Sequence, residues 1–333
     1  MGRYTARRLL QFIPVLIGTA FLLHYLQTIS LQINGNPIRS LFGDRQPPPE
    51  TIAALTRAFG LDDPCLESTG NPCLGMFVDR LGNYATGDFG VDFNQQSVLD
   101  LVVRAAPITV RLALLAIIFE TVLGILAGIL AGLNKDKFAD NAVRIGTVLA
   151  ISVPVFVLGV LIQIFFGLYI GNWLRDRGAP GWLQAMFSIS YQADYPWASL
   201  VIPAFVLGAI SLGFIARLTR TSLVESLRSD YVRTARAKGL KPIRVVGVHA
   251  LRNSLIPVVT YIGIDVGALM GGAIVTEGIF NIPGIGGLTF QSIRNGETPV
   301  VIAVVVLLTL VFLLTSLLVD LLYAVLDPRI RYE

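Results

Sequence analysis

Charged residues are scarce in this chain of 333 amino acids. Asp, Glu, Lys and Arg together make up 14% of the residues, whereas hydrophobic residues make up 54%. Soluble globular domains carry about 25% charged residues, which cover the surface that faces water. The composition therefore excludes a chain that is soluble throughout, and it favours a protein whose surface largely faces lipid.

Residues that carry common enzyme chemistry are also scarce. The chain has four lysines and none follows a glycine, so it lacks the Gly-Lys-Ser/Thr element of a phosphate-binding ATPase loop. The two histidines, His24 and His249, lie far apart and form no His-Glu-x-x-His zinc motif. Two cysteines are too few for a structural zinc site. We therefore predict no catalytic residues, no bound metal and no ATPase site in this chain.

Long apolar blocks, in contrast, are abundant. Six blocks are each at least 20 residues long, which is enough for a helix to cross the hydrocarbon core. In lipid the backbone must satisfy its own hydrogen bonds, so each block is expected to be helical. The sequence thus predicts an all-α integral membrane protein with six transmembrane helices. The blocks are Leu9–Leu31, Ile108–Leu133, Ala142–Leu174, Ala198–Leu218, Ser254–Phe280 and Val300–Leu326.

Basic residues are distributed unevenly between the two sides of the predicted helices. The two terminal tails and the segments after the second and fourth blocks hold 17 of the 26 Lys and Arg residues. Because basic residues gather on the cytoplasmic side, both termini are expected to be cytoplasmic. The net charge of +4 is therefore explained by basic residues that face the anionic lipids of the cytoplasmic leaflet. A nucleic-acid partner is not needed to account for it. Trp173, Trp182 and Trp197 cluster on the opposite side, as an interfacial aromatic belt does.

The blocks divide the chain into three parts. Residues 1–32 form the N-terminal tail and first helix, and residues 33–106 form an outer domain rich in turn-forming residues. Residues 107–333 form a core of five helices that includes a basic segment, 217–252. Cys65 and Cys73 both lie in the outer domain, where an oxidising environment permits a disulfide. Two free thiols are the alternative.

Small and acidic residues inside the helices are further candidates. Glycines four residues apart provide a face for close helix contact, used either for sliding during gating or for tight packing. Ionisable residues within a membrane are functional candidates. Asp265 and Glu277 could line a translocation pathway. Alternatively, Asp265 could pair with another helix, and Glu277 could have a structural or gating role. A proton-coupled transporter is the alternative, although no inverted repeat is evident. The glycines are Gly124, Gly128, Gly132, Gly263, Gly267 and Gly271.

The basic segment carries the signals of two short helices. Ser229 is a good N-cap residue, and Gly239 is a good stop after the helical run Tyr231–Lys238. Pro242 is suited to the first turn of a second helix. The sequence predicts a small rigid knob that could insert into a groove on another protein. A solvated basic loop without a partner is the alternative.

Asp230–Leu240 and the following His249–Pro257 together resemble the coupling-helix signature of bacterial ABC-importer permeases, specifically the dipeptide/oligopeptide branch. The resemblance extends over the chain, through Gly60-Leu61-Asp62-Asp63-Pro64, Glu277-Gly278-Ile279-Phe280 and Leu326-Asp327-Pro328-Arg329. One departure is Arg233-Thr234-Ala235, where the general importer motif has Glu-Ala-Ala. The Cys65–Cys73 segment looks like an insertion.

This resemblance implies a type I importer fold and a permease subunit in the bacterial inner membrane, without a cofactor of its own. The implied partners are a second homologous permease, two ATPase subunits that use ATP and Mg²⁺, an extracellular substrate-binding protein and membrane lipids. The implied cargo is a di- or oligopeptide, with nickel chelates, glutathione and haem-like compounds as alternatives. The residues expected to dock on the ATPase are Tyr231, Arg233, Thr234, Ala235, Arg236, Ala237, Lys238, Gly239 and Leu240.

Overall fold

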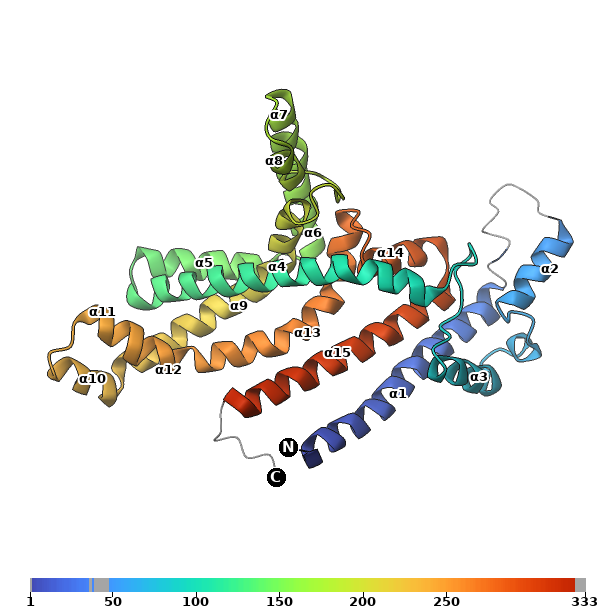
Figure 1. The fold of residues 1–333 in the computed structure, drawn as a ribbon, viewed down its shortest axis with the longest axis horizontal. Coiled ribbons are helices and arrows are strands. Elements are labelled where there is room, and N and C mark those ends of the chain that lie inside the picture. The colour runs from blue at the N-terminus through green and yellow to red at the C-terminus, as the bar shows by residue number, and fades with distance from the viewer. Residues whose placement is uncertain (1, 36–37, 39–47, 327–333) are drawn as a thin grey trace. The chain divides into compact units, whose positions relative to one another are not determined.

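A computed structural model describes residues 2–35, 38 and 48–326, and these residues are predominantly helical (Figure 1). Its contacts define two compact units. The first unit consists of the described residues up to Ala105 together with Leu288–Leu313, and the second consists of Ala106–Gly287 together with the described residues from Leu314 onwards. The α-helices are α1 Gly2–Asn34, α2 Pro49–Ala58, α3 Leu74–Ala85, α4 Val98–Leu133, α5 Phe138–Ser152, α6 Val155–Ile162, α7 Gly171–Asp176, α8 Gly181–Met186, α9 Val201–Arg228, α10 Asp230–Ala237, α11 Pro242–Arg244, α12 Arg252–Ser254, α13 Ile256–Ile279, α14 Ile285–Asn295 and α15 Thr298–Leu326. The 3₁₀ and π segments are η2 Pro64–Glu67, η3 Gln163–Ile170, η4 Ala198–Leu200 and η5 Val245–Leu251.

Five helices are long and apolar enough to cross a membrane. A sixth crossing requires Pro242–Ser254 and Ile256–Leu269, which bend by 45° at a short break, to act as one span. The all-α membrane class is therefore confirmed, and the structure gives five or six candidate spans. The five are Thr5–Asn34, Val98–Leu133, Val155–Asp176, Ala198–Arg228 and Thr298–Leu321.

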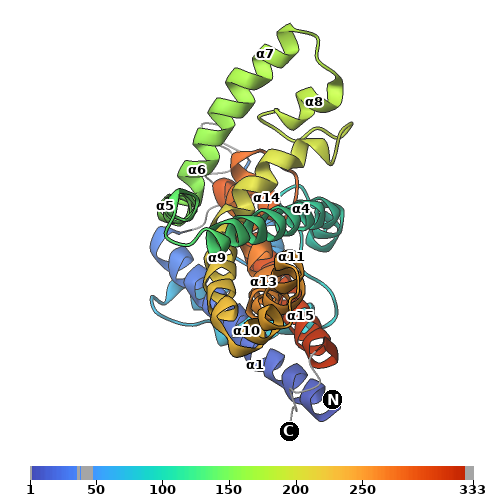
Figure 2. The same ribbon diagram turned by 90° about the vertical axis from the view of Figure 1, so that its left-hand side faces the viewer.

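The third apolar block is not the single helix that we predicted. Figures 1 and 2 show α5 and α6 meeting at a sharp bend. Val153 and Pro154 between them have extended backbones, with ψ angles of 123° and 136°. Proline removes a helical hydrogen bond and disfavours the α conformation at the residue before it, so the helix ends there and a new one begins.

The fourth block extends beyond its predicted boundary, whereas the fifth agrees with its prediction. Helix α9 continues to Arg228, ten residues past the expected end at Leu218. The expected fifth helix, Ser254–Phe280, corresponds to α13 at Ile256–Ile279, and Leu255 separates it from α12. The basic segment is therefore joined to both neighbouring helices by helical structure, and three of its arginines belong to α9 itself.

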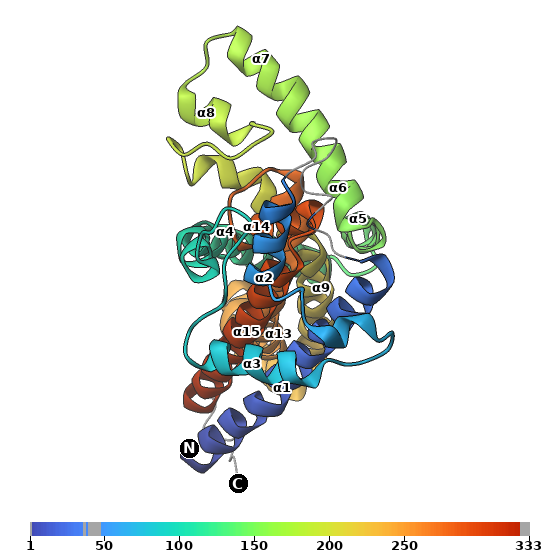
Figure 3. The same cartoon turned by 90° about the vertical axis from the view of Figure 1, so that its right-hand side faces the viewer.

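The first unit packs α3 and the start of α15 on α1. Phe77 of α3 shares a buried cluster with Ala20 of α1 and with Ile302 and Val306 of α15. Figure 3 shows α3 lying across α1. The imidazole Nε2 of His24 lies 3.1 Å from the carbonyl oxygen of Pro72 and 3.2 Å from that of Cys73, which fixes the loop before α3.

The second unit is built around α9. In the most apolar stretch of this helix 67% of the residues are buried, more than in any of the other four candidate spans. Its side chains pack with those of α4 and α13 in one cluster that includes Leu112, Leu207 and Leu269. The turn that follows α13 contributes Phe280 and Ile282 to the same cluster. Helix α9 is therefore the central element against which its neighbours are placed.

Candidate functional site

The predicted knob is formed by α10 and the helical stretch α11–η5–α12. Helix α10 begins directly after Ser229, the only residue between it and α9, and Gly239 follows its end with a φ of +74°. Pro242 occupies the first turn of α11, as expected. The Ser229 hydroxyl does not cap α10, because it donates to the Ser226 carbonyl at the end of α9. The two predicted helices are confirmed, and the predicted side-chain cap is wrong.

A small apolar core fixes this knob to α9. Val232 and Ala235, one turn apart on α10, are buried and pack on Leu223 of α9. Val245 and Ala250 of η5 complete the cluster from the other side. One residue connects α10 to α9, and a shared core holds the two helices together.

The opposite side of the knob is exposed and mixes basic with apolar side chains. Ile243 of α11 is 83% exposed, which is unusual for a large aliphatic residue outside a lipid-facing surface, and Tyr231 is 42% exposed. Leu240 is partly buried beneath this surface. A rigid face of this composition is suited to binding another protein. The other exposed residues of the predicted docking set are Arg233, Thr234, Arg236, Ala237, Lys238 and Gly239.

Tyr231 ties the start of α10 to its neighbours. Hydrogen bonding with Ser226, then with Ser229 and Asn253, lowers the pKa of the Tyr231 phenol. These partners lie at the end of α9, at the junction and on α12. The side chain therefore joins the two helical arms at the base of the knob.

Glu277 holds the turn after α13 in place. Its carboxylate is fully buried and accepts hydrogen bonds from the Thr109 hydroxyl at 2.7 Å and from the Gly287 amide at 2.8 Å. The Thr109 hydroxyl oxygen in turn accepts from the Ile285 amide at 2.8 Å. Gly284 lies so close to Glu277 and Thr109 that it leaves no room for a side chain. The network thus connects α4, α13 and the beginning of α14.

Asp265 is packed inside the second unit. It lies on α13, is 8% exposed, and interacts with the carboxyl group of Glu120, a fully buried residue of α4. Two carboxyl groups at close quarters repel each other when both are ionised. The structure places Asp265 and Glu277 on the same helix but in separate polar clusters. Their roles in a pathway remain predictions.

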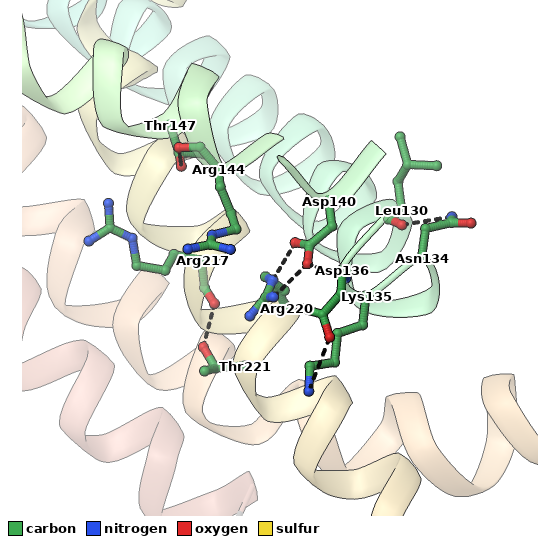
Figure 4. A network of polar contacts seen from close by, with 10 residues as sticks. All are labelled: Leu130, Asn134, Lys135, Asp136, Asp140, Arg144, Thr147, Arg217, Arg220 and Thr221. Carbon is green, nitrogen blue, oxygen red and sulfur yellow. Dashed lines mark hydrogen bonds and ion pairs between the residues drawn. The ribbon is translucent and has the colours of Figure 1, made fainter. Parts of the chain in front are cut away.

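A third polar cluster connects α5 with α9 (Figure 4). The Asp140 carboxylate is fully buried and accepts two hydrogen bonds from Arg220, 2.5 Å from Nε and 2.6 Å from Nη2. The Asp136 amide donates to the same carboxylate at 2.8 Å. Hydrogen bonding from Arg220 lowers the pKa of Asp140 to about 2, so the pair stays charged at neutral pH.

Comparisons with known proteins place the chain in a family. Residues 124–332 match the family described as "Binding-protein-dependent transport system inner membrane component". The chain belongs to this permease family. It is 35% identical to a di/tripeptide transport permease of Pseudomonas aeruginosa and 36% identical to a dipeptide transport permease of Alkalihalophilus pseudofirmus, each over the full length of both chains. It is 34% identical to a glutathione transport permease of Escherichia coli, again over both full lengths.

In this permease the first glycine series contacts α9. A side-chain carbon added at Gly124 would lie 2.7 Å from Cγ2 of Ile215, and one added at Gly132 would lie 3.1 Å from Cδ2 of Leu223. Gly128 is between them and faces Thr219. The series therefore forms one continuous contact between α4 and α9. Gly263, Gly267 and Gly271 share α13.

Gly128→Ala should push α4 away from α9 and destabilise the permease by about 1–3 kcal/mol, the usual cost of overpacking. The added carbon would lie 2.5 Å from Cβ of Thr219 and 2.6 Å from the backbone oxygen of Ala216, which cannot move independently. Thermal unfolding of the purified permease measures the effect. Gly146→Ala is the matched control, because its added carbon meets nothing within 4 Å. Equal unfolding temperatures for the two variants would contradict the close contact.

The cysteines of the first unit are joined. The structure forms a Cys65–Cys73 disulfide with a Cα–Cα distance of 5.6 Å. Within the parts of the chain that the structure covers, no group of three or more His, Cys, Asp or Glu side chains could hold a metal ion. Sequence reasoning missed Thr109, Asp140 and Arg220, whose partners are 80 or more residues away. Asp265 was recognised as a candidate, but nothing in the sequence indicates that it interacts with Glu120.

Proposed function

We propose that this chain is one permease subunit of an ATP-driven importer of di- and oligopeptides in the bacterial inner membrane. Full-length similarity to permeases named for di/tripeptide and dipeptide transport supports the cargo class. The observation that carries the proposal is the knob, a basic face held rigidly on α9 by Val232 and Ala235. The knob docks on a separate ATPase subunit.

The complex contains this chain, a homologous second permease, two ATPase subunits that bind ATP and Mg²⁺, and an extracellular substrate-binding protein. The chain crosses the membrane six times, with α13 as the fifth span and both termini in the cytoplasm. The distribution of Lys and Arg supports this orientation. Residues 33–106 form the outer domain and 107–333 the permease core, and the chain itself has no ATPase site and binds no cofactor.

Alternating access follows from how the knob is attached. Closure of the ATPase subunits on ATP displaces α10, and its shared core passes the motion to α9. Helix α13 moves with α9, because α13 packs directly on α9 and also contacts α12 of the knob. A ligand shifts such a two-state bundle only by binding one state better than the other. The ATPase dimer supplies that difference at the knob, and peptide-loaded binding protein supplies it on the other side.

Uptake by the reconstituted complex tests the proposal. Proteoliposomes that contain the complex, its binding protein and internal ATP with Mg²⁺ should accumulate a labelled dipeptide, and those with ADP should not. A proton gradient without ATP should drive no uptake. Uptake under that condition would identify a proton-coupled carrier and overturn the proposal.

Glutathione is a second candidate cargo, because one full-length relative is named for glutathione transport. Unlabelled glutathione and unlabelled dipeptide should be compared as competitors of dipeptide uptake. We expect the dipeptide to compete at far lower concentration. Stronger competition by glutathione would assign that cargo while leaving the importer function intact.

A further inference from the structure

A basic pocket lies between α5 and α9 in the second unit. Its volume is about 420 Å³, which is within the range of about 300–1,000 Å³ for small-molecule sites. Three arginines line it, together with the apolar surfaces of Val143, Val148 and Ala216. The basic residues are Arg144 on α5 and Arg217 and Arg220 on α9.

The antiparallel packing of α5 and α9 brings these arginines together. Asp140 binds Arg220, and a carbon added at Gly213 would lie 3.3 Å from the backbone oxygen of Thr147. Arg144 and Arg217 each lie about one helical turn from this contact, on the side of the Asp140–Arg220 pair. In Figure 4 the Arg144 side chain extends from α5 toward α9.

Two of the three arginines form no direct ion pair, although Arg144 also attracts the Asp140 carboxylate at longer range. Asp140 neutralises Arg220 through a bidentate pair. Arg144 and Arg217 are exposed, and neither forms an ion pair with another residue in the described part of the chain. The pocket therefore presents a net charge of about two above an apolar floor. Guanidinium groups bind phosphate through directed, charge-assisted hydrogen bonds.

The pocket lies at the level of the lipid phosphates along the membrane normal. Trp197 precedes the α9 span and belongs to the tryptophan cluster expected at one interface, where it lies beneath Arg111. At 1.5 Å per residue, the 20 residues from Trp197 to Arg217 span about 30 Å. This is the thickness of the hydrocarbon core. Arg217 therefore lies at the opposite interface, beside the basic segment.

We propose that this pocket binds the phosphate of an anionic phospholipid from the same leaflet as the basic knob. The two free arginines hold the phosphate, and Val143, Val148 and Ala216 contact the glycerol and the start of an acyl chain. The neighbouring surface of α5 supports a lipid over a soluble anion, because Ile145 and Leu149 are 62% and 59% exposed. The site sits between α5 and α9, and the bound lipid stabilises their contact.

Native mass spectrometry of the complete complex tests the site. The complex, purified through this chain, is equilibrated with equimolar phosphatidylglycerol and phosphatidylethanolamine in mild detergent. We expect preferential retention of phosphatidylglycerol. Arg144→Gln combined with Arg217→Gln should reduce that preference about 30-fold, since each basic residue near an anionic headgroup contributes roughly a factor of five. Lys137→Gln, an exposed lysine at the start of α5 outside the pocket, should leave the preference unchanged.

Two further measurements test whether charge determines the lipid preference and whether a soluble anion can replace the lipid. Arg144→Lys combined with Arg217→Lys keeps both charges and should retain most of the preference, whether or not the glutamine variant assembles. Inorganic phosphate at 100-fold excess over lipid should not displace the bound phosphatidylglycerol. Equal retention of both lipids by the unmodified complex, or an unchanged preference in the glutamine variant, would overturn the proposal. Displacement by phosphate would also overturn it, by assigning the pocket to a soluble anion.

Discussion

Gly239→Pro should reduce ATP-dependent peptide uptake to background while the chain still inserts into the membrane. Gly239 has a φ of +74°, whereas proline fixes φ near −65°. Its amide also donates to the Arg236 carbonyl at 3.0 Å, a bond that proline cannot make. Proline also favours an extended backbone at the residue before it, whereas Lys238 has a ψ of 4°. At a cost of about 3 kcal/mol or more, the last turn of α10 should unwind and displace the docking face.

Two companion variants separate docking from folding. Gly247→Ala changes a glycine in the same knob, but its added carbon meets nothing within 4 Å, so uptake should be normal. Arg236→Glu reverses one exposed charge without touching the apolar core, and it should weaken co-purification of the ATPase subunit. Uptake assays and quantitative co-purification measure both effects. Normal uptake in the Gly239→Pro variant would remove the knob from the coupling mechanism.

The knob was predictable from sequence because its signals are local. A glycine that tolerates positive φ and a proline at a helix start each act within a few residues. The hydrophobic blocks were equally accessible, since each depends on composition over about 20 residues. The residues on which α10 packs could not be predicted from the sequence. Leu223 and Val245 come together only when the chain has folded back on itself.

The polar clusters could not be predicted for the same physical reason. Thr109 and Glu277 are 168 residues apart, and Asp140 and Arg220 are 80 apart. Each residue alone reads as an ordinary helix position, and only the packing of α4, α5 and α13 around α9 makes it a partner. Pro154 shows a related limit. Proline predicts a disturbed helix, but whether the helix bends or ends depends on how the next segment packs.

Gly284→Ala should cause a large loss of stability in the permease, about 3 kcal/mol or more. An added carbon at Gly284 would lie 2.5 Å from Oε1 of Glu277 and 2.5 Å from Oγ1 of Thr109. The clash cannot be relieved by a rotamer change, because both side chains are buried and hydrogen-bonded. Separating them leaves buried polar groups unpaired, at about 1–3 kcal/mol each, in addition to the steric cost. Thermal unfolding of the purified complex measures the loss.

Thr109→Val distinguishes the hydrogen-bond network from simple crowding. This variant keeps nearly the same volume but removes the hydroxyl that bonds Glu277 and the Ile285 amide. If the network holds the turn, Thr109→Val should cost about 1–3 kcal/mol, because the Glu277 carboxylate and the Ile285 amide each lose one buried hydrogen bond. Gly18→Ala, with open space around its added carbon, should unfold like the unmodified protein. If Gly284→Ala destabilises the permease but Thr109→Val does not, close packing alone holds the turn after α13 in place. The hydrogen bond between Thr109 and Glu277 then contributes nothing to its stability.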